Sequence, residues 1–449
     1  MPNKSDLRIH FTSLGCDKNL VDTEKMLSLL ASEGYGFTEN EAEADVLIIN
    51  TCCFIGDAKE ESIQRILELA EYKKTGKAKA LIATGCLSER YRKEIRSELP
   101  ELDGVLGIAS WHRIGEVVEE VLAGKEQEVF LETGQAAPEM TDRVLTTGGH
   151  YAFLKIAEGC DKRCTYCVIP LVRGAYVSVP MEQLVEEAGK LAEKGVKELI
   201  LVAQETTVYG VDLYGRKMLP ELLRRLCAIP GIYWIRLMYC YPEEITDELI
   251  DVIASEEKIC HYLDMPVQHA SDRILRRMGR HTTRRQITDM VNRLRERIPD
   301  IVLRTTLMTG FPGETDEDFE ILKEFVDETS FERLGVFAYS PEEGTAAFGM
   351  PDQVPDELKN ARKDEIMALQ QEISAAVEES CTGSDFLVMI EGYLPDDGVY
   401  VGRTYMDAPG VDSYIFVRTE ENLMSGDFAW VTVTGSDAYD LIGELSEEE

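Results

Sequence analysis

The sequence predicts an α/β protein with an N-terminal parallel α/β domain, a central barrel-like parallel sheet and a small C-terminal β-barrel. Strand-like and helical segments alternate through the first third of the chain, and a second alternation follows that repeats six times. In the C-terminal region, short strand-like runs are separated by turns alone. A chain of 449 residues has room for two or three domains, each with its own core.

Three apolar runs in the first third share one arrangement, in which a strand-like run ends in a turn and a cysteine. The runs and their cysteines are 7–14 with Cys16, 46–49 with Cys52 and 80–83 with Cys86. Segments 21–32 and 58–73 between them have helical periodicity. Because strand–helix–strand order gives a parallel sheet, strand ends of one kind lie along one edge. We therefore expect the three thiols, here called the dispersed triplet, to meet at that edge.

The dispersed triplet has two interpretations. Each cysteine alone fits a small buried hydrophobe, which is how cysteine often packs. Three thiols at the same position of successive strands favour a metal site instead. Cys53 competes with Cys52 as the ligand, but side chains alternate along a strand end, so only one of the two faces the shared edge. We choose Cys52 because it matches the other two strand ends.

The central region contains six strand-like runs separated by amphipathic segments such as 181–194 and 284–297. The runs cover residues 151–157, 198–203, 232–238, 262–267, 301–308 and 334–339. Six βα units in a row predict a parallel barrel-like sheet, with functional groups on the loops that follow the strands. The first of these loops contains Cys160, Cys164 and Cys167, here called the compact triplet.

The spacing Cys-x3-Cys-x2-Cys of the compact triplet predicts an iron–sulfur cluster. Zinc would need a fourth ligand from elsewhere, and zinc ribbons usually pair two Cys-x2-Cys knuckles, whereas this sequence has no second knuckle. A 4Fe–4S cube held by three protein thiolates keeps one iron open, and a cofactor can chelate that iron. Two triplets predict two clusters, and therefore redox or radical chemistry.

The composition limits which cellular compartment and which kinds of binding partner are expected. The chain starts without an apolar signal core, it has no run of roughly eighteen apolar residues, and its eleven cysteines are too sparse for a disulfide scaffold. We therefore expect a cytoplasmic protein with reduced thiols. The formal charge of −36 disfavours binding of nucleic acid through phosphate contacts alone. It fits either plain solubility or a basic protein partner.

The compact triplet, with Tyr166 before its last cysteine, resembles the cluster-binding motif of radical S-adenosylmethionine enzymes. Together with the dispersed triplet, it makes the chain similar to the methylthiotransferases almost end to end. The matching motifs are Gly15-Cys16, Asn50-Thr51-Cys52, Thr84-Gly85-Cys86, Ile156-Ala157-Glu158-Gly159-Cys160, Gln268-His269 and Gly310-Phe311-Pro312-Gly313-Glu314. The resemblance implies that the six βα units form a partial (βα)6 radical-SAM barrel.

The resemblance also implies the chemistry. The compact triplet would bind a 4Fe–4S cluster whose open iron is chelated by S-adenosylmethionine. One electron would cleave that cofactor into methionine and a radical that removes hydrogen from an unactivated carbon. A second 4Fe–4S cluster on the dispersed triplet would present a methylated sulfur that is joined to the substrate radical. Such an enzyme needs an electron donor and a sulfur donor, neither of which the sequence names.

Four further residues fit contacts to S-adenosylmethionine: Tyr166 in the cysteine loop and Gln204, Gln268 and Gly310 at strand ends. Amide side chains can bind adenine or ribose, and a glycine lets a ligand approach the backbone. From the residues alone, Gly310 also fits an ordinary turn, and His269 fits a surface or satisfied histidine. No residue beyond the cluster ligands is expected to be catalytic.

The C-terminal region predicts a small β-barrel that in position resembles the TRAM domain of methylthiotransferases, usually a substrate-recognition module. Its strand-like runs are 386–390, 399–401, 413–417 and 428–433. From Ser380 onward there are fifteen acidic residues and only two basic ones, Arg403 and Arg418. Even without the closing residues 447–449, such a barrel should repel an RNA backbone and attract a basic polypeptide.

The methylthiotransferase family divides by substrate. One branch modifies an adenosine in transfer RNA, and another converts an aspartate of small-subunit ribosomal protein S12 into 3-methylthioaspartate. Motifs 15–22 and 402–409 resemble the ribosomal-protein branch, whereas the tRNA branch typically has Gln-Met where this chain has Asp17-Lys18. The ribosomal branch usually has proline at position 17 and glycine where Ser413 stands, but neither position is a ligand. We expect ribosomal protein S12 as the substrate and no membrane partner.

Two alternatives stay open at this point. A tRNA adenosine methylthiotransferase would alter a tRNA base, and a non-catalytic electron-transfer or regulatory iron–sulfur protein would not cleave S-adenosylmethionine. The polar stretch from about 124 to 150 is expected to be a linker. The predicted division is an N-terminal domain at 1–135, a linker at 136–149, the barrel at 150–378 and the TRAM domain at 379–446. The other cysteines are expected to be structural: Cys53, Cys227, Cys240, Cys260 and Cys381.

Overall fold

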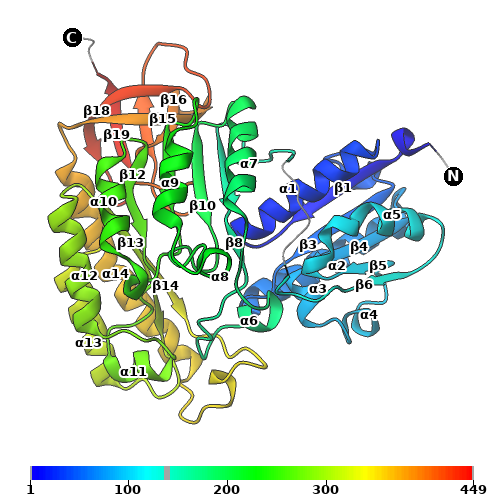
Figure 1. Cartoon of the computed structure of the whole chain (residues 1–449), viewed down its shortest axis with the longest axis horizontal. Helices are drawn as coiled ribbons and strands as arrows, with labels where there is room; N and C mark the ends of the chain where they lie inside the picture. Colours follow the sequence, from blue (N-terminus) through cyan, green and yellow to red (C-terminus); the bar gives the residue numbers. More distant parts are fainter. Residues whose placement is uncertain (1–2, 136–141, 447–449) are drawn as a thin grey trace. The chain divides into compact units, whose positions relative to one another are not determined.

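A computed structural model describes residues 3–135 and 142–446 of the chain (Figure 1). Residues 136–141 of the predicted linker and the acidic end 447–449 lie outside the described residues, as do residues 1–2. The chain divides into two compact units. Unit 1 comprises Met1–Thr146, Lys155–Glu187 and Ser340–Phe348, and unit 2 comprises Thr147–Leu154, Ala188–Tyr339 and Gly349–Glu449.

Unit 1 is built on a parallel sheet whose described strands follow the order β2-β1-β3-β4-β5-β6. The strands are β1 (Arg8–Ser13), β2 (Gly36–Phe37), β3 (Val46–Thr51), β4 (Ala80–Gly85), β5 (Gly104–Leu106) and β6 (Gln127–Val129). The helices that connect these strands are α1 (Asp17–Ser32), α2 (Gly56–Thr75), α3 (Cys86–Arg90), α4 (Ile95–Glu98) and α5 (Ile114–Leu122). The predicted alternation of strands and helices is confirmed, and β1, β3 and β4 are neighbours in the sheet.

Helices cover both faces of this sheet, which explains the continuous apolar runs of its central strands. Val46 and Ile48 of β3 share one apolar core with α1 and α5. Leu47 and Ile49, which point to the other face, share a second core with α2. Every residue of β3 and β4 is therefore buried. This two-sided packing fixes the register of the strands, and with it the places where they end.

The polar stretch that was predicted as a linker is partly structured, so that prediction was wrong for its first part. It contains β6, which pairs in parallel with β5. Farther along, the buried side chain of Arg143 donates to Glu24 of α1 at 3.1 Å and to Glu187 at 2.9 Å. The edge strand β6 has three residues, and only one of them, Val129, has a buried apolar side chain. A strand this short gives no apolar run that could be recognised in the sequence.

Unit 2 contains the predicted six-stranded sheet, in the order β14-β13-β12-β11-β10-β7 among the described residues. The strands are β7 (Tyr151–Lys155), β10 (Glu198–Val202), β11 (Trp234–Leu237), β12 (Ile259–Asp264), β13 (Val302–Thr309) and β14 (Arg333–Ala338). Strands β10 to β14 pair in parallel, as predicted.

Helices follow the strands of this sheet in the order that the sequence predicts (Figure 1). They are α7 (Met181–Glu193), α8 (Val211–Tyr214), α9 (Leu219–Cys227), α10 (Asp247–Ser255), α11 (Asp272–Arg277), α12 (Arg284–Arg297), α13 (Asp316–Thr329) and α14 (Asp356–Ser380). Among the described residues, no helix is both long and apolar enough to cross a membrane.

The C-terminal region forms a closed β-barrel, which confirms the predicted small barrel. Its strands are β15 (Asp385–Leu394), β16 (Val399–Arg403), β17 (Ile415–Arg418), β18 (Phe428–Ser436) and β19 (Leu441–Leu445). The sequence did not predict β19, which pairs with both β17 and β18 and thereby closes the barrel. Side chains of the barrel and of strands β10 to β13 share one apolar core.

Buried ion pairs also join the barrel to the sheet within unit 2. Glu198 at the start of β10 is fully buried and accepts hydrogen bonds from Arg236 of β11 at 2.7 Å and from Arg403 of β16 at 2.7 Å. A buried carboxylate is stable only when it is paired and hydrogen-bonded, and the two guanidinium groups meet that need.

Candidate functional site

The dispersed triplet lies at one edge of the sheet of unit 1, as the parallel arrangement predicted. Cys16 precedes α1, Cys52 follows β3, and Cys86 follows β4. Gly15, in the turn before Cys16, has a positive φ of 91°, and a Cβ built on it would lie 3.0 Å from the Cys52 sulfur. Only glycine allows this close approach of the β1 and β3 turns. Cys52 and Cys86 are buried, and Cys16 is exposed.

Asn19, on the first turn of α1, connects the three cysteine-bearing turns. Its Nδ2 donates to the carbonyl of Leu14 after β1 and to the carbonyl of Thr51 at the end of β3, each at 3.0 Å. Its Oδ1 accepts from the Cys86 thiol at 3.7 Å. The side chain is 1% exposed, so these groups replace water as its partners. Asn19 thus holds together the strand ends that carry the triplet.

A buried charged network surrounds the same edge, and sequence reasoning missed it. Arg173 donates to Asn19 Oδ1 at 2.5 Å, to Glu158 at 2.6 Å and to the Cys86 sulfur at 3.6 Å. Lys155 donates to Glu158 at 2.8 Å and also forms an ion pair with Asp22 of α1. A lysine and a glutamate within or beside an apolar strand-like run were the available signal, because a charge there needs a partner.

Burial dominates the acid–base behaviour of the buried thiols. It raises the pKa of Cys52 and Cys86, although the charge of Arg173 acts to lower the pKa of both. Burial likewise raises the pKa of Cys53 to about 12, and that side chain packs in the apolar core under the sheet. Any metal bound by Cys52 and Cys86 would have to displace protons from these buried thiols.

The donor set fits an iron–sulfur cluster. All eleven cysteines are described and are thiols rather than disulfides. In the described part of the chain, no three His, Cys, Asp or Glu side chains converge as ligands of a single metal ion. A 4Fe–4S cube makes a different demand, because each of its cysteines binds a different iron, and soft thiolates suit iron–sulfur clusters.

The compact triplet lies on the loop between β8 (Ala157–Glu158) and α6 (Ile169–Val172), also in unit 1. The Cys160 N–H donates to the Gly174 carbonyl at 3.2 Å, and the Cys167 N–H donates to the Cys164 carbonyl at 3.0 Å. Gly159 has a positive φ of 73°, and a Cβ there would lie 2.1 Å from a backbone oxygen of Ala175. The loop is thus folded tightly by its own backbone.

The thiols of this loop are close enough to interact. Burial raises the pKa of the Cys167 thiol, and the neighbouring Cys164 and Cys160 raise it further. Cys160 and Cys164 are buried, whereas Cys167 and the adjacent Tyr166 are half-buried. The structure therefore groups the compact triplet with Tyr166 on one short loop, as the spacing predicted.

The other three candidate contacts to S-adenosylmethionine lie in unit 2, at the carboxyl ends of strands. Gln204 follows β10 and is half-buried. Gln268 follows β12 with a positive φ of 71°, and its backbone bonds to Thr306 and Met308 of β13 at 2.9 and 2.8 Å. A left-handed glutamine is costly, and such conformations persist where the surroundings hold them in place. Gly310 follows β13 with the same φ of 71°.

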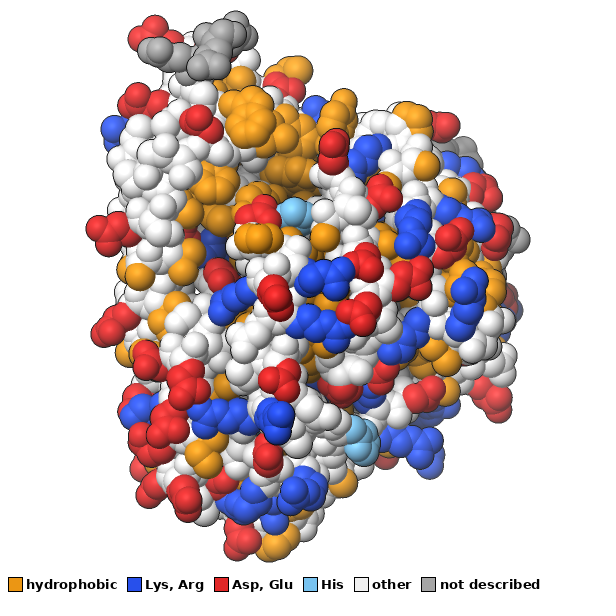
Figure 2. Space-filling view, turned by 60° about the vertical axis from the view of Figure 1, so that its left-hand side comes forward, with side chains coloured by type: hydrophobic (Ala, Val, Ile, Leu, Met, Phe, Trp, Pro, Cys, Tyr) orange, Lys and Arg blue, Asp and Glu red, His pale blue; other side chains and the backbone are white. Residues whose placement is uncertain are grey.

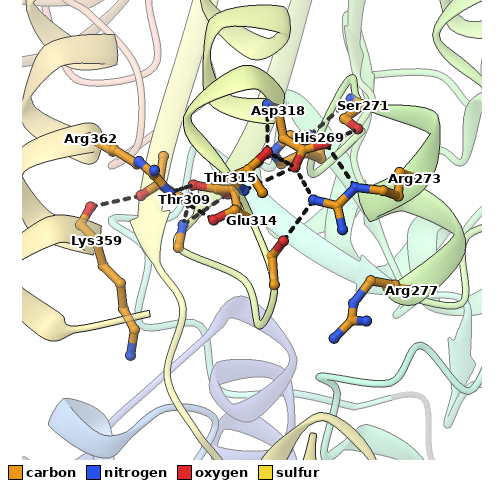
Figure 3. Close-up of polar contacts among 12 residues, drawn as sticks. His269, Ser271, Arg273, Arg277, Thr309, Glu314, Thr315, Asp318, Lys359 and Arg362 are labelled. Carbon is orange, nitrogen blue, oxygen red and sulfur yellow. Dashed lines mark hydrogen bonds and ion pairs between the residues drawn. The ribbon is translucent and has the colours of Figure 1, made fainter. Parts of the chain in front are cut away.

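Glu314 joins these strand ends, and Figure 3 shows it between His269 on one side and Arg362 on the other. Its carboxylate accepts from the Gly310 N–H at 2.9 and 3.0 Å and from Arg362 at 2.7 Å. His269 Nε2 lies 3.2 Å from the same carboxylate. Because the Ser271 N–H donates to His269 Nδ1 at 2.9 Å, the ring proton is on Nε2 and points at Glu314.

The contacts of Gly310 give it a packing role. A Cβ on this glycine would lie 2.1 Å from the Cγ of Lys359 of α14. Lys359 is itself 3% exposed, so its stem fills the space beside the strand end. His269 is fully buried and hydrogen-bonded rather than exposed. The structure thus supports the satisfied-histidine interpretation and adds Glu314, Arg362 and Lys359 to the site.

A cavity of about 230 Å³ opens in unit 1 beside the charged network. Asp22, Lys155, Glu158 and Arg173 form part of its wall, and Trp111 and Leu131 give it apolar surface. The network therefore borders both the Cys86 thiol and an open space.

Comparisons with known proteins give the relationships of the chain. Residues 154–326 match the Radical SAM superfamily, residues 8–107 match the uncharacterized protein family UPF0004, and residues 382–445 match the TRAM domain. Two solved radical S-adenosylmethionine enzymes share the fold. The methyltransferase TsrM from Kitasatospora setae has a TM-score of 0.56 at 13% identity and covers 88% of this chain and 77% of its own. The cobalamin-dependent enzyme OxsB has a TM-score of 0.52 at 13% identity and covers 82% and 56%.

Curated relatives are similar over almost the whole chain. The ribosomal protein uS12 methylthiotransferase RimO of Lachnoclostridium phytofermentans is 62% identical over 437 residues, which are 97% of this chain and 99% of that protein. The protein of the same name from Thermoanaerobacter sp. strain X514 is 51% identical over 435 residues, or 96% and 98%. The predicted resemblance to the methylthiotransferases is thereby confirmed. This chain belongs to the ribosomal protein uS12 methylthiotransferase family, RimO.

Proposed function

We propose that this chain is a radical S-adenosylmethionine methylthiotransferase that inserts a methylthio group at the β-carbon of an aspartate in ribosomal protein uS12. The observation that carries the proposal is the 62% identity, over 97% of the chain, to a relative named ribosomal protein uS12 methylthiotransferase. The site supports it, because both cysteine triplets lie in the same compact unit.

The compact triplet is proposed to hold the 4Fe–4S cluster that binds S-adenosylmethionine. When bound, these groups supply the carbon radical that removes hydrogen from the substrate. The tight cysteine loop fixes the three thiolates, and Tyr166 lies within it. Gln204, Gln268 and Gly310 are proposed to contact S-adenosylmethionine, since ligands of parallel sheets bind beyond the carboxyl ends of the strands.

The dispersed triplet is proposed to hold a second 4Fe–4S cluster, here called the auxiliary cluster. Cys16, Cys52 and Cys86 end three neighbouring segments, and Asn19 ties those segments to one another. Cys53 is proposed to be structural because it is fully buried in the apolar core that α2 covers, whereas Cys52 and Cys86 each keep some exposure. Cys52 and Cys86 are buried, so water would have little access to these two ligand sulfurs.

The charges of unit 2 support a protein substrate over RNA. Arg403, one of the two basic residues of the barrel, is buried against Glu198, so among the described barrel residues Arg418 alone presents an exposed positive charge. The arginine-rich helix α12 is also neutralised, because Arg284 and Arg297 pair with Glu328 and Asp251.

Figure 2 shows blue and red side chains lying next to one another over much of the face in view, below an area of orange side chains. An RNA backbone needs a continuous positive surface, whereas a basic polypeptide is attracted to an acidic one. The basic protein substrate would accordingly be recruited by the acidic barrel. We also propose that the division into 1–135, 136–149, 150–378 and 379–446 describes functional domains, and that the enzyme is cytoplasmic and takes its electron from a reducing partner.

Mass spectrometry of ribosomal protein from cells with and without the gene tests the proposal. We expect a methylthio mass addition on one aspartate of uS12 that disappears when the gene is deleted and returns when it is restored. A variant lacking the compact triplet, Cys160→Ala/Cys164→Ala/Cys167→Ala, should fail to restore it. An unchanged uS12 mass together with loss of a methylthiolated adenosine in tRNA would overturn the substrate assignment.

A further inference from the structure

Arg173 is a buried cation that contacts a proposed ligand of the auxiliary cluster. It follows α6, six residues after the last cysteine of the compact triplet, and is 1% exposed. Its Nη2 lies 3.6 Å from the Cys86 sulfur and 2.5 Å from Asn19 Oδ1. The segment that follows the compact triplet therefore places a fixed positive charge beside Cys86 of the dispersed triplet.

The acidic residues around Arg173 already have another cation. Lys155 pairs with both Glu158 and Asp22, which are also the ion-pair partners of Arg173. These ion pairs between described residues join two cations to two carboxylates before any thiolate is considered. Lys155 can already neutralise Glu158. Charge balance with Glu158 therefore does not explain why Arg173 also contacts the Cys86 sulfur.

We propose that Arg173 is a positioning residue for the auxiliary cluster, which holds the Cys86 sulfur and makes that cluster easier to reduce. The inference rests on the proposed function, because it assumes a cluster on the dispersed triplet. A hydrogen bond to a ligand sulfur and a nearby positive charge both stabilise the form of a cluster that carries one more electron. The low dielectric of the buried site strengthens the effect, since water does not screen the charge.

The electron count of the proposed reaction explains why a positive charge beside Cys86 would help. A carbon radical contributes one electron to a new carbon–sulfur bond, and a thiolate sulfur contributes two. One electron is therefore left over when the bond forms. A bound auxiliary cluster would be the acceptor: the bond between the methylthio sulfur and the cluster would break, and the cluster would be reduced by one electron. A positive charge fixed beside Cys86 favours that acceptance, and it does so without moving during the reaction.

A redox titration of the auxiliary cluster tests the proposal independently of activity. The background variant Cys160→Ala/Cys164→Ala/Cys167→Ala removes the ligands of the other cluster, so the spectroscopic signal comes from the auxiliary cluster alone. In this full-length background, Arg173→Gln removes the charge but keeps hydrogen-bond donors, and Arg173→Lys keeps the charge. Dithionite supplies the electron, and electron paramagnetic resonance measures the reduced cluster.

We expect a lower midpoint potential for Arg173→Gln and a smaller change for Arg173→Lys. Arg143→Gln is the matched control, because Arg143 is equally buried in unit 1 and pairs with Glu24 and Glu187 instead of a cysteine. It should leave the potential unchanged. An equal potential in the background protein and its Arg173→Gln derivative would overturn the proposal.

Loss of iron is also informative. If Arg173→Gln binds no iron while Arg173→Lys does, the charge itself is needed and the proposal is supported. If neither binds iron and Arg143→Gln does, Arg173 is a structural residue and the proposal is wrong. A background protein that binds no iron before Arg173 is changed would remove the auxiliary cluster from the proposed function, and this inference with it.

Discussion

The Asn19 side chain donates a hydrogen bond to the carbonyl of Thr51 at 3.0 Å, and Thr51 is the residue directly before Cys52. A single amide on α1 thus constrains the end of β3, 32 residues away in the sequence, and with it the position of Cys52, which directly follows that strand. Side-chain to backbone bonds of this kind are strong constraints when they are buried, because no water can replace them.

Asn19→Ala should lower the free energy of unfolding by about 2–3 kcal/mol, since the carbonyls of Leu14 and Thr51 lose a buried donor. Urea unfolding would measure the loss. The variant should also bind less iron, because the turns of the dispersed triplet are no longer held together. Asn360→Ala is the control, since its side chain is exposed on α14. Full iron content in Asn19→Ala would contradict this role.

Iron content distinguishes one cluster from two. Reconstituted without oxygen, the chain should bind about eight irons, and replacing either triplet by alanine should remove about four. Cys53→Ala is the matched control, because Cys53 is adjacent to Cys52 but packs in the apolar core. It should keep all of the iron. The same count before and after loss of Cys16, Cys52 and Cys86 would rule out the second cluster.

Gly310→Ala should lower the free energy of unfolding by about 3 kcal/mol, because the new Cβ meets Lys359 and the backbone is left-handed. Gly215→Ala separates the two causes. Gly215 has the same φ of 71°, but a Cβ there would meet no described atom within 4 Å. It should cost only about 1–2 kcal/mol. Equal losses in the two variants would show that the contact with Lys359 does not matter.

The stability of the protein should decrease between about pH 4.5 and 7 through Glu378. Burial raises the pKa of Glu378 from 4.5 to about 7, although Arg333 acts to lower it. Between these values the folded protein holds the proton and the unfolded chain does not, so stability falls by about 3 kcal/mol as the pH rises. Below pH 4.5 and above pH 7 this contribution is constant.

Glu378→Gln removes the titrating group and should flatten this part of the pH profile. Thermal unfolding at several pH values, with matched cluster content, would measure the difference. Glu379→Gln, at the exposed neighbouring position, should keep the original slope. If Glu378→Gln keeps that slope as well, Glu378 does not titrate in this range.

The sequence predicts the strands and cysteines well because their patterns are local. The continuous apolar run 46–49 identifies a strand that is buried on both faces, and Cys52 follows it directly. Strand β19 was not predicted, because Gly443 and Glu444 interrupt its apolar pattern and its pairing comes from β17 and β18. Such pairing is a tertiary effect that no local window contains.

The partners of the cysteines are the part of the site that local patterns do not give. Asn19 lies in a motif that was used only to choose the substrate branch, and its contacts are 5, 32 and 67 residues away. Arg173 and Asp22 are separated by a large part of the chain, yet they form one ion pair. A polar residue in a motif indicates a constraint, but only the fold shows which group it satisfies.

The buried pairing of Glu198 with Arg403 limits how the C-terminal barrel can be exchanged. A chimera that replaces residues 382–446 with the equivalent part of a distant relative would leave Glu198 and Arg236 facing a foreign surface. Glu198 would keep Arg236 but lose its second buried guanidinium partner, and this loss would weaken the central sheet as well as the graft. A chimera that transfers substrate preference would therefore need to exchange positions 198 and 236 together with the barrel. The segment that can be exchanged without loss of stability is larger than the TRAM domain itself.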